Sequence, residues 1–257
     1  MNILSWNTNG YTKANMHSIN DIFSLSKYDL ILFQETKNSN VPLLLTMSKY
    51  KIINFSSKKP NYGGTLSAVK QPPISITKGI GIEEFDNEGR VTTLEYDNFF
   101  VINAYFPFAG DFLAKIDAKM SFLHEFERHC MDLKNKKPLI ICGDFNIAHK
   151  DIDRTFGNES MPGFSKEERA WFSSFLNLGF IDSFRFLHKD VKKYSSVWYN
   201  DKHKADRLDY CILSKELGET LKSSDILSSV DGSDHMPIAI EFGINYSVPN
   251  KSSNFDE

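Results

Sequence analysis

Short polar residues flank several apolar runs of the sequence, at points where buried strands would begin or end. Asn7 follows the run Ile3–Trp6, and Asp234 with His235 directly precedes the run Met236–Phe242. The other residues of this kind are Gln34, Glu35, Asn103, Tyr105, Asp144, Asn146 and Asp209. Because side chains at the strand ends of layered α/β folds converge on one crevice, we expect this set to form one site.

Four of these residues, Glu35, Asp144, Asp209 and Asp234, carry carboxylates. Carboxylates gathered without a partner repel each other and raise one another's pKa. A divalent cation removes that conflict, and oxygen ligands with amides nearby suit Mg²⁺ or Mn²⁺ better than zinc. A hard cation in an open carboxylate site suits phosphoryl chemistry, because it polarises a phosphate oxygen and neutralises charge in the transition state.

His235 supplies a second chemical function beside the carboxylates. A histidine held by a carboxylate can act as a positioned acid, base or phosphate ligand, and Asp209 is our candidate for the orienting carboxylate. His149 and Asp153 are expected to make local bonds instead.

Each residue also has a structural explanation. A single Asp or Asn at a strand end commonly caps a turn, and Tyr105, two residues before Pro107, could belong to the core. The recurrence of such residues at the ends of separate apolar runs is what favours a shared site.

The hydrophobic pattern alternates strands with helices and predicts an α/β fold. A capping box at Ser165–Glu168 begins one helix. The expected helices are 15–26, 111–134 and the segment after Ser165, and the expected strands are 3–6, 29–33, 65–69, 91–96, 99–106, 138–142, 208–213 and 236–242. No linker divides the chain, so we expect one domain over residues 1–243 and a loose polar tail over 244–257.

Composition limits the function classes. The chain has 257 residues, 30 basic and 33 acidic, for a net charge of −3. That balance does not favour a protein that coats nucleic acid electrostatically, but a nuclease with an acidic metal site remains compatible. No apolar run reaches the ~18 residues of a membrane span, and the N-terminal residues do not resemble a signal peptide. Cys130, Cys142 and Cys211 fit reduced, buried thiols of a cytoplasmic protein.

Seven motifs in order give the chain a family resemblance from residue 1 to about 243. It resembles the endonuclease/exonuclease/phosphatase superfamily, and within it the exonuclease III type of apurinic/apyrimidinic (AP) endonuclease. The motifs are Leu4-Ser-Trp-Asn-Thr-Asn-Gly10, Leu32-Phe-Gln-Glu-Thr-Lys37, Asn103-Ala-Tyr-Phe-Pro107, Ile141-Cys-Gly-Asp-Phe-Asn-Ile-Ala-His149, Gly163-Phe-Ser-Lys-Glu-Glu-Arg-Ala-Trp171, Arg207-Leu-Asp-Tyr210 and Gly232-Ser-Asp-His-Met-Pro237.

The resemblance implies a four-layer α/β sandwich of two packed mixed sheets flanked by helices, and a Mg²⁺-dependent phosphodiesterase in which Mn²⁺ can substitute. By position, Glu35 would be the main metal carboxylate, with Asn7 and Asp234 close to the metal or at a second metal position. The wider set implied to bind metal is Glu35, Asn7, Asp144, Asn146, Asp234 and His235.

The same resemblance implies catalytic roles. Asp144 would orient or deprotonate the attacking water, and Asn146 would hold that water or the phosphate. The residues implied to contact the phosphate are Asn7, Tyr105, Asn146 and His235, with His235 paired to Asp209. The implied reaction cleaves double-stranded DNA 5′ of an abasic site and leaves a 3′-hydroxyl, with 3′→5′ exonuclease or trimming of blocked 3′ ends. The lesion would be extruded into a pocket. We expect a monomer, nucleoid-associated in a prokaryote or nuclear in a eukaryote.

Three positions depart from the family's pattern around the lesion pocket. Asp206 stands where a Trp usually precedes Arg-Leu-Asp-Tyr, Phe108 where an Asn follows Tyr-x-Pro, and Met161 where an Asn is expected. Phe108, Trp198 or Tyr199 would supply replacement stacking surface. These departures leave hydrolysis intact and leave lesion specificity open.

Two alternatives follow. The first is a same-fold metal-dependent nuclease with another substrate, or a phosphatase of phosphoesters. The second is a binding module that has lost catalysis, which the joint presence of the carboxylates, Asn146 and His235 argues against.

Overall fold

Two six-stranded mixed β-sheets form the centre of the protein. The structure is a computed structural model, and it describes residues 1–198 and 201–244. The first sheet has the order β13-β14-β1-β2-β4-β3. Its strands are β1 (Asn2–Asn7), β2 (Leu30–Gln34), β3 (Lys51–Phe55), β4 (Thr65–Val69), β13 (Leu221–Ile226) and β14 (Ile238–Phe242).

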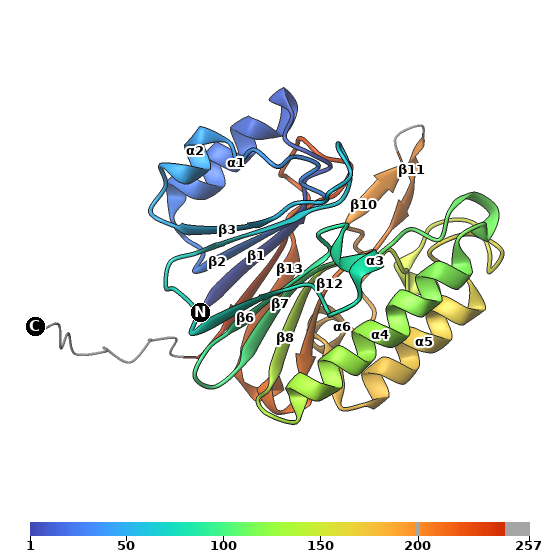
Figure 1. The fold of residues 1–257 in the computed structure, drawn as a ribbon. Helices are drawn as coiled ribbons and strands as arrows, with labels where there is room; N and C mark the ends of the chain where they lie inside the picture. The colour runs from blue at the N-terminus through green and yellow to red at the C-terminus, as the bar shows by residue number, and fades with distance from the viewer. Residues whose placement is uncertain (199–200, 245–257) are drawn as a thin grey trace, which may run out of the picture.

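The second sheet has the order β5-β6-β7-β8-β12-β9. Its strands are β5 (Ser75–Lys78), β6 (Val91–Glu95), β7 (Phe100–Tyr105), β8 (Leu139–Asp144), β9 (Phe180–Asp182) and β12 (Asp209–Ser214). A separate antiparallel pair, β10 (Ser196–Trp198) and β11 (Asp201–Asp206), projects from one end of the sandwich (Figure 1).

Helices cover the outer faces of both sheets, which confirms the predicted four-layer sandwich (Figure 1). Over the first sheet lie α1 (Lys13–Leu25) and α2 (Leu43–Thr46), and over the second lie α4 (Ile116–Lys134) and α5 (Lys166–Asn177). The shorter helices are α3 (Glu83–Asp86), α6 (Ser183–Leu187), and the 3₁₀ turns Asp111–Leu113, Asp151–Asp153 and Lys215–Thr220.

The four layers follow from the two-residue period of the strands. Successive side chains of a strand point to opposite faces. In β8, Ile140 and Cys142 therefore join the core between the sheets, whereas Leu139 and Ile141 join the core beneath α4 and α5. Because both faces of such a strand are buried, its sequence is a continuous apolar run.

Two of the strand-end polar residues join the sheets. The Gln34 side-chain amide donates to Asn103 Oδ1 at 2.8 Å, and Asn103 Nδ2 donates to the carbonyls of Phe33 at 3.2 Å and Leu66 at 3.0 Å. Both residues are fully buried. They hold one sheet against the other beside the site, which is a structural role.

The helix expected over 111–134 is divided in the structure. Phe112 and Leu113 have positive φ angles of 53° and 63°, and the regular helix begins only at Ile116. Nothing in the amphipathic stripe of this segment indicates such a break. The predicted capping box is confirmed, since the Ser165 side chain accepts from the Glu168 amide.

The three cysteines are free and buried, as expected. No helix of the described residues is long and apolar enough to cross a membrane.

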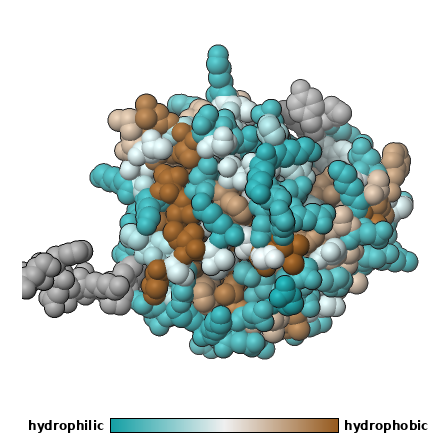
Figure 2. Space-filling view, viewed as in Figure 1, coloured by the Kyte–Doolittle hydropathy of each residue, from teal (hydrophilic) through white to brown (hydrophobic). Residues whose placement is uncertain are grey.

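The face shown in Figure 2 is largely hydrophilic, with hydrophobic residues gathered in a stripe. Two predictions fall on residues that the structure does not describe. These are the polar tail, of which only Ile244 is described, and the stacking role of Tyr199.

Candidate active site

The site forms where paired strands from both sheets end. In the first sheet the last residue pair between the parallel strands β1 and β2 is Asn7 with Gln34. In the second sheet Tyr105 and Asp144 are the last pair between β7 and β8, and Asp209 lies opposite Asp144 on β12. Strand register thus brings residues far apart in sequence to one edge of the sandwich.

Asp144 connects the two sheets at this edge. Its Oδ2 accepts a hydrogen bond from Asn7 Nδ2 at 2.8 Å, and its Oδ1 accepts from the Asn146 backbone amide at 2.8 Å. The Asn146 side-chain amide lies 3.3 Å from the same Oδ2. Burial and the neighbouring Asp209 carboxylate raise the pKa of Asp144 to about 7, against the lowering effect of His235. This carboxyl group is therefore suited to exchange a proton near neutral pH.

His235 faces Asp144 from the segment that precedes β14, three residues before Ile238. Its Nδ1 lies 2.8 Å from Asp209 Oδ2, and its Nε2 lies 4.0 Å from Asp144 Oδ2. Burial alone would lower the pKa of His235, but Asp209 and Asp144 outweigh it, so the pKa lies well above its usual value. The raised pKa favours the charged form of the imidazole when no metal is bound, and Nε2 is directed at the Asp144 side of the site.

The buried groups Asp144, Asp209 and His235 form a cluster able to bind a metal ion. Their donor atoms lie within 4.8 Å of one another. Asp209 Oδ2 also accepts from Ser195 Oγ at 2.7 Å, while its Oδ1 has no hydrogen-bond partner among the described residues.

Glu35 lies at the more exposed rim, one residue beyond β2. Its φ of 54° is uncommon for a residue with a side chain. Its Oε1 is 3.2 Å from Lys37 Nζ. Lys37 also contacts Asn9 Oδ1, and Asn9 Nδ2 donates to Asp234 Oδ1 at 3.1 Å. Glu35 and Asp234 are therefore linked through two intervening side chains.

Tyr105 lies against a buried arginine, Arg90. The Arg90 guanidinium is 4.9 Å from the centre of the Tyr105 ring and donates to its carbonyl oxygen at 3.1 Å. Burial, together with the charge of Glu35, raises the pKa of Tyr105 well above its usual value. The phenol therefore stays protonated and is available as a hydrogen-bond donor.

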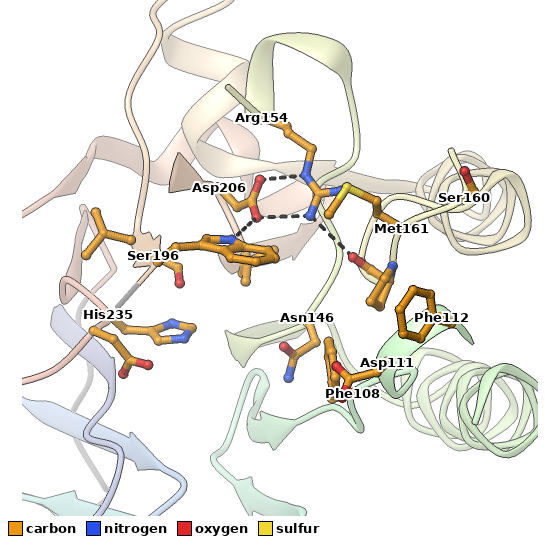
Figure 3. Close-up of a pocket in the computed structure, with 16 residues that line it drawn as sticks. Phe108, Asp111, Phe112, Asn146, Arg154, Ser160, Met161, Ser196, Asp206 and His235 are labelled. Atoms are coloured by element: carbon orange, nitrogen blue, oxygen red, sulfur yellow. Dashed lines mark hydrogen bonds and ion pairs between the residues drawn. The ribbon is translucent and has the colours of Figure 1, made fainter. Parts of the chain in front are cut away.

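A cavity of about 600 Å³ opens beside these groups. Asn146, Asp234 and His235 line it, together with Phe108, Phe112, Met161, Trp198, Arg154 and Asp206. In Figure 3 the His235 ring and the Asn146 amide occupy one side, and the Arg154–Asp206 pair occupies another.

The Asp206 carboxylate forms a two-point ion pair with Arg154, at 2.7 Å and 3.0 Å. Trp198 Nε1 lies 3.4 Å from the same carboxylate. The structure thus places an indole in the cavity although the position before Arg207 is an aspartate. Phe108, the second proposed stacking residue, also lines the cavity with 47% of its surface exposed.

Several site residues were missed by the sequence analysis. Asn9 and Lys37 lie inside the first two family motifs. Each is two residues from a predicted site residue, Asn7 or Glu35, and this spacing could have indicated that they belong to the site. Ser195 and Arg154 sit in loops with no distinguishing pattern. The side chain of His149 contacts α5 instead of residues near it in sequence, with Ser173 Oγ at 2.8 Å and the Phe172 ring stacked on the imidazole. Asp153 is not merely local, because it also accepts from the buried Arg207 at 2.8 Å.

Residues 4–235 match the model of the Endonuclease/Exonuclease/phosphatase family. The chain belongs to this family. It is 37% identical over 254 residues to an exodeoxyribonuclease of Bacillus subtilis, covering 95% of this chain and 100% of that one. It is 36% identical to the DNA repair nuclease APEX1 of Danio rerio, covering 93% and 81% of the two chains.

Solved structures share the fold of this family member. An AP endonuclease from Archaeoglobus fulgidus superposes with a TM-score of 0.84 at 22% identity, covering 95% of this chain and 100% of that one. An AP endonuclease from Leishmania major gives a TM-score of 0.82 at 24% identity, covering 93% and 86%. The exonuclease III resemblance predicted from the motifs is confirmed, and with it the class of nuclease hydrolase.

Proposed function

We propose that the protein is a Mg²⁺-dependent DNA-repair phosphodiesterase that cleaves 5′ of abasic sites and leaves a 3′-hydroxyl. The proposal includes 3′→5′ exonuclease or 3′-end-trimming activity, with double-stranded DNA carrying such lesions as substrate for a monomeric enzyme. The observation that carries it is the approach of His235 Nε2 to within 4.0 Å of Asp144 Oδ2 at the wall of the cavity. The names of relatives support it, among them a DNA-(apurinic or apyrimidinic site) endonuclease of Dictyostelium discoideum.

The donor chemistry of the site fits a hard divalent cation. Glu35, Asn7 and Asp234 offer carboxylate and amide oxygens, the ligand type that Mg²⁺ prefers. Glu35 is the partly exposed carboxylate, 21% accessible, whereas Asp144 is nearly inaccessible at 1%. We assign Glu35 as the main metal ligand, with Asn7 and Asp234 beside it and Asp144 and Asn146 completing the wider set. His235, although the resemblance places it in that set, is left to the phosphate, because a protonated imidazole has no lone pair for a metal. Bound there, the cation would polarise the phosphate and neutralise charge.

Asp144 acts as the base in the proposed mechanism. Its carboxylate accepts a proton from the attacking water, and the hydrogen bond from Asn7 fixes the orientation of the accepting oxygen. The Asn146 amide, 3.3 Å from that oxygen, holds the water or a phosphate oxygen in line. Placement of this kind supplies much of the rate enhancement in hydrolysis.

His235 and Tyr105 stabilise the developing negative charge. The protonated imidazole donates from Nε2 to a non-bridging phosphate oxygen, while Asp209 holds Nδ1 and keeps the ring charged. The Tyr105 phenol, protonated because its pKa is raised, donates a second hydrogen bond. Donors aimed at developing charge in a partly buried site are strong contributors to catalysis.

A second candidate keeps the hydrolytic groups and changes the substrate. The Arg154–Asp206 ion pair gives the cavity a polar wall where a Trp is usual in the family. That wall favours a same-fold nuclease or phosphoester phosphatase with another specificity.

Incision of an abasic duplex distinguishes the two candidates. The protein with Mg²⁺ is incubated with a duplex carrying a tetrahydrofuran abasic analogue, alongside undamaged duplex, 3′-phosphate duplex and an inositol phosphate. We expect incision 5′ of the analogue, a 3′-hydroxyl product, loss of activity with EDTA and recovery with Mg²⁺ or Mn²⁺. Hydrolysis of the inositol phosphate alone would support the second candidate, and EDTA-resistant incision would exclude the metal assignment.

Replacing Trp198 with alanine is expected to weaken binding of the abasic duplex about 10-fold. The indole would pack on the extruded sugar, and about 55 Å² of apolar surface buried at roughly 25 cal/mol per Å² gives this factor. Fluorescence anisotropy in Ca²⁺, without turnover, measures the change. The control is Phe186→Ala, which removes a half-exposed ring of α6 outside the cavity. Equal affinity of Trp198→Ala and the parent would remove Trp198 from the substrate pocket.

A further inference from the structure

We infer that the buried ion pair between Lys119 and Glu168 positions Asn146 for catalysis and ties it to the wall of the substrate cavity. Lys119 lies on α4 and Glu168 on α5, and both side chains have no exposed surface. The inference rests on the proposed function, because it assumes that Asn146 acts on the water or phosphate.

Lys119 holds the backbone of Asn146 directly. Its Nζ donates to the Asn146 carbonyl oxygen at 2.6 Å and lies 2.7 Å from Glu168 Oε1. Asn146 has a φ of 51°, a left-handed conformation that surrounding contacts must maintain in a residue with a side chain. The Asn146 side-chain amide itself donates to the Phe106 carbonyl at 3.0 Å and to Asp144 Oδ2 at 3.3 Å. The ammonium group therefore fixes the backbone of the turn from which this side chain projects.

Glu168 extends the same contact to the cavity wall. Its Oε1 also accepts from the Gly163 amide at 3.2 Å, and its Oε2 accepts from the Ser165 amide at 3.0 Å. Gly163 lines the cavity, and its carbonyl accepts from the Ala148 amide at 2.7 Å. One buried pair thus fixes both the turn that carries Asn146 and the loop that bounds the cavity.

Stability alone does not account for this arrangement. A buried ion pair is weak evidence for stability, because well-packed apolar residues often serve as well. The ammonium group here supplies what an apolar side chain cannot, a donor for the carbonyl of a left-handed turn. We therefore assign Lys119 and Glu168 as positioning residues for the hydrolytic site.

A double-mutant experiment tests the assignment. Lys119→Met is made in the parent and in Asn146→Ala, and kcat and KM are measured on the abasic duplex. In the parent background we expect kcat to fall about 10-fold or more, since small misplacements of catalytic groups carry such losses, while KM changes less than about 3-fold. In the Asn146→Ala background the same substitution should change kcat less than about 2-fold.

The matched control is Lys137→Met, which removes an ion pair with Glu95 at the opposite end of β8 and should leave kcat unchanged. Circular dichroism verifies folding of each variant. If Lys119→Met does not fold, Lys119→Met/Glu168→Gln, which buries no unpaired charge, replaces it. A parental kcat for the Lys119 variant, or an equal loss in both backgrounds, would overturn the inference. If Asn146→Ala itself keeps parental activity, the proposed role of Asn146 fails as well.

Discussion

His235→Ala should reduce the single-turnover rate of abasic incision by on the order of 10²-fold or more, the scale for removing a positioned electrostatic group. The reason is the raised pKa of His235, which keeps the ring charged and its Nε2 available to the phosphate. Duplex affinity should change far less, because the group acts mainly on charge that develops in the transition state.

The dependence of the incision rate on pH tests the charge state of His235 independently. A raised pKa means that the charged imidazole persists above its usual titration range and is lost as pH rises through the folded value. Parental activity should therefore decline on the alkaline side, and His235→Ala should lack that decline. His17→Ala, an exposed histidine on α1, serves as the control. Incision by His235→Ala at the parental rate would contradict its assigned role.

Glu35→Gln should lower incision at 1 mM Mg²⁺ by on the order of 10²-fold, because it weakens binding of the metal ion, whose stabilisation of transition-state charge is worth several kcal/mol. Gln keeps the size of the side chain and one oxygen donor but removes the charge. Raising the Mg²⁺ concentration should restore part of the rate in Glu35→Gln, whereas it saturates early in the parent.

The control for Glu35 is Glu216→Gln, an exposed glutamate outside the site. Glu35→Gln also removes the ion pair with Lys37, whose ammonium group lies 3.2 Å from Glu35 Oε1. The metal affinity must therefore be measured separately from the incision rate. Isothermal titration of Mn²⁺ measures the affinity directly. Unchanged Mn²⁺ affinity and unchanged Mg²⁺ dependence in Glu35→Gln would remove Glu35 from the metal site.

The sequence could predict those site residues that lie where an apolar run ends. Asp144 and Asn146 follow a continuous apolar run, so the sequence indicates that they lie at the end of a buried strand. The convergence of that strand with β12 could be expected from layered folds, and the register places Asp209 opposite Asp144. The pairing of His235 with Asp209 was predicted from chemistry and is found at 2.8 Å.

The remaining features depend on tertiary contacts that have no local pattern. Lys119 lies on the apolar stripe of α4, so the helical period predicts that it is buried but does not show which residue pairs with its charge. Glu168 is recognised in the sequence only as part of a helix cap. Gln34 and Asn103 resembled site residues but hold the sheets together, since sequence alone does not tell which face of a strand end a side chain takes. The left-handed turns at Glu35 and Asn146 contain no glycine that would reveal them.

The most direct test of the account is a crystal of the protein grown with Mn²⁺ and cleaved abasic DNA, measured at an energy where manganese scatters anomalously. We predict an anomalous peak in contact with the Glu35 carboxylate, with the 5′-phosphate of the product next to His235. Manganese bound away from Glu35, or a phosphate out of reach of His235, would contradict it.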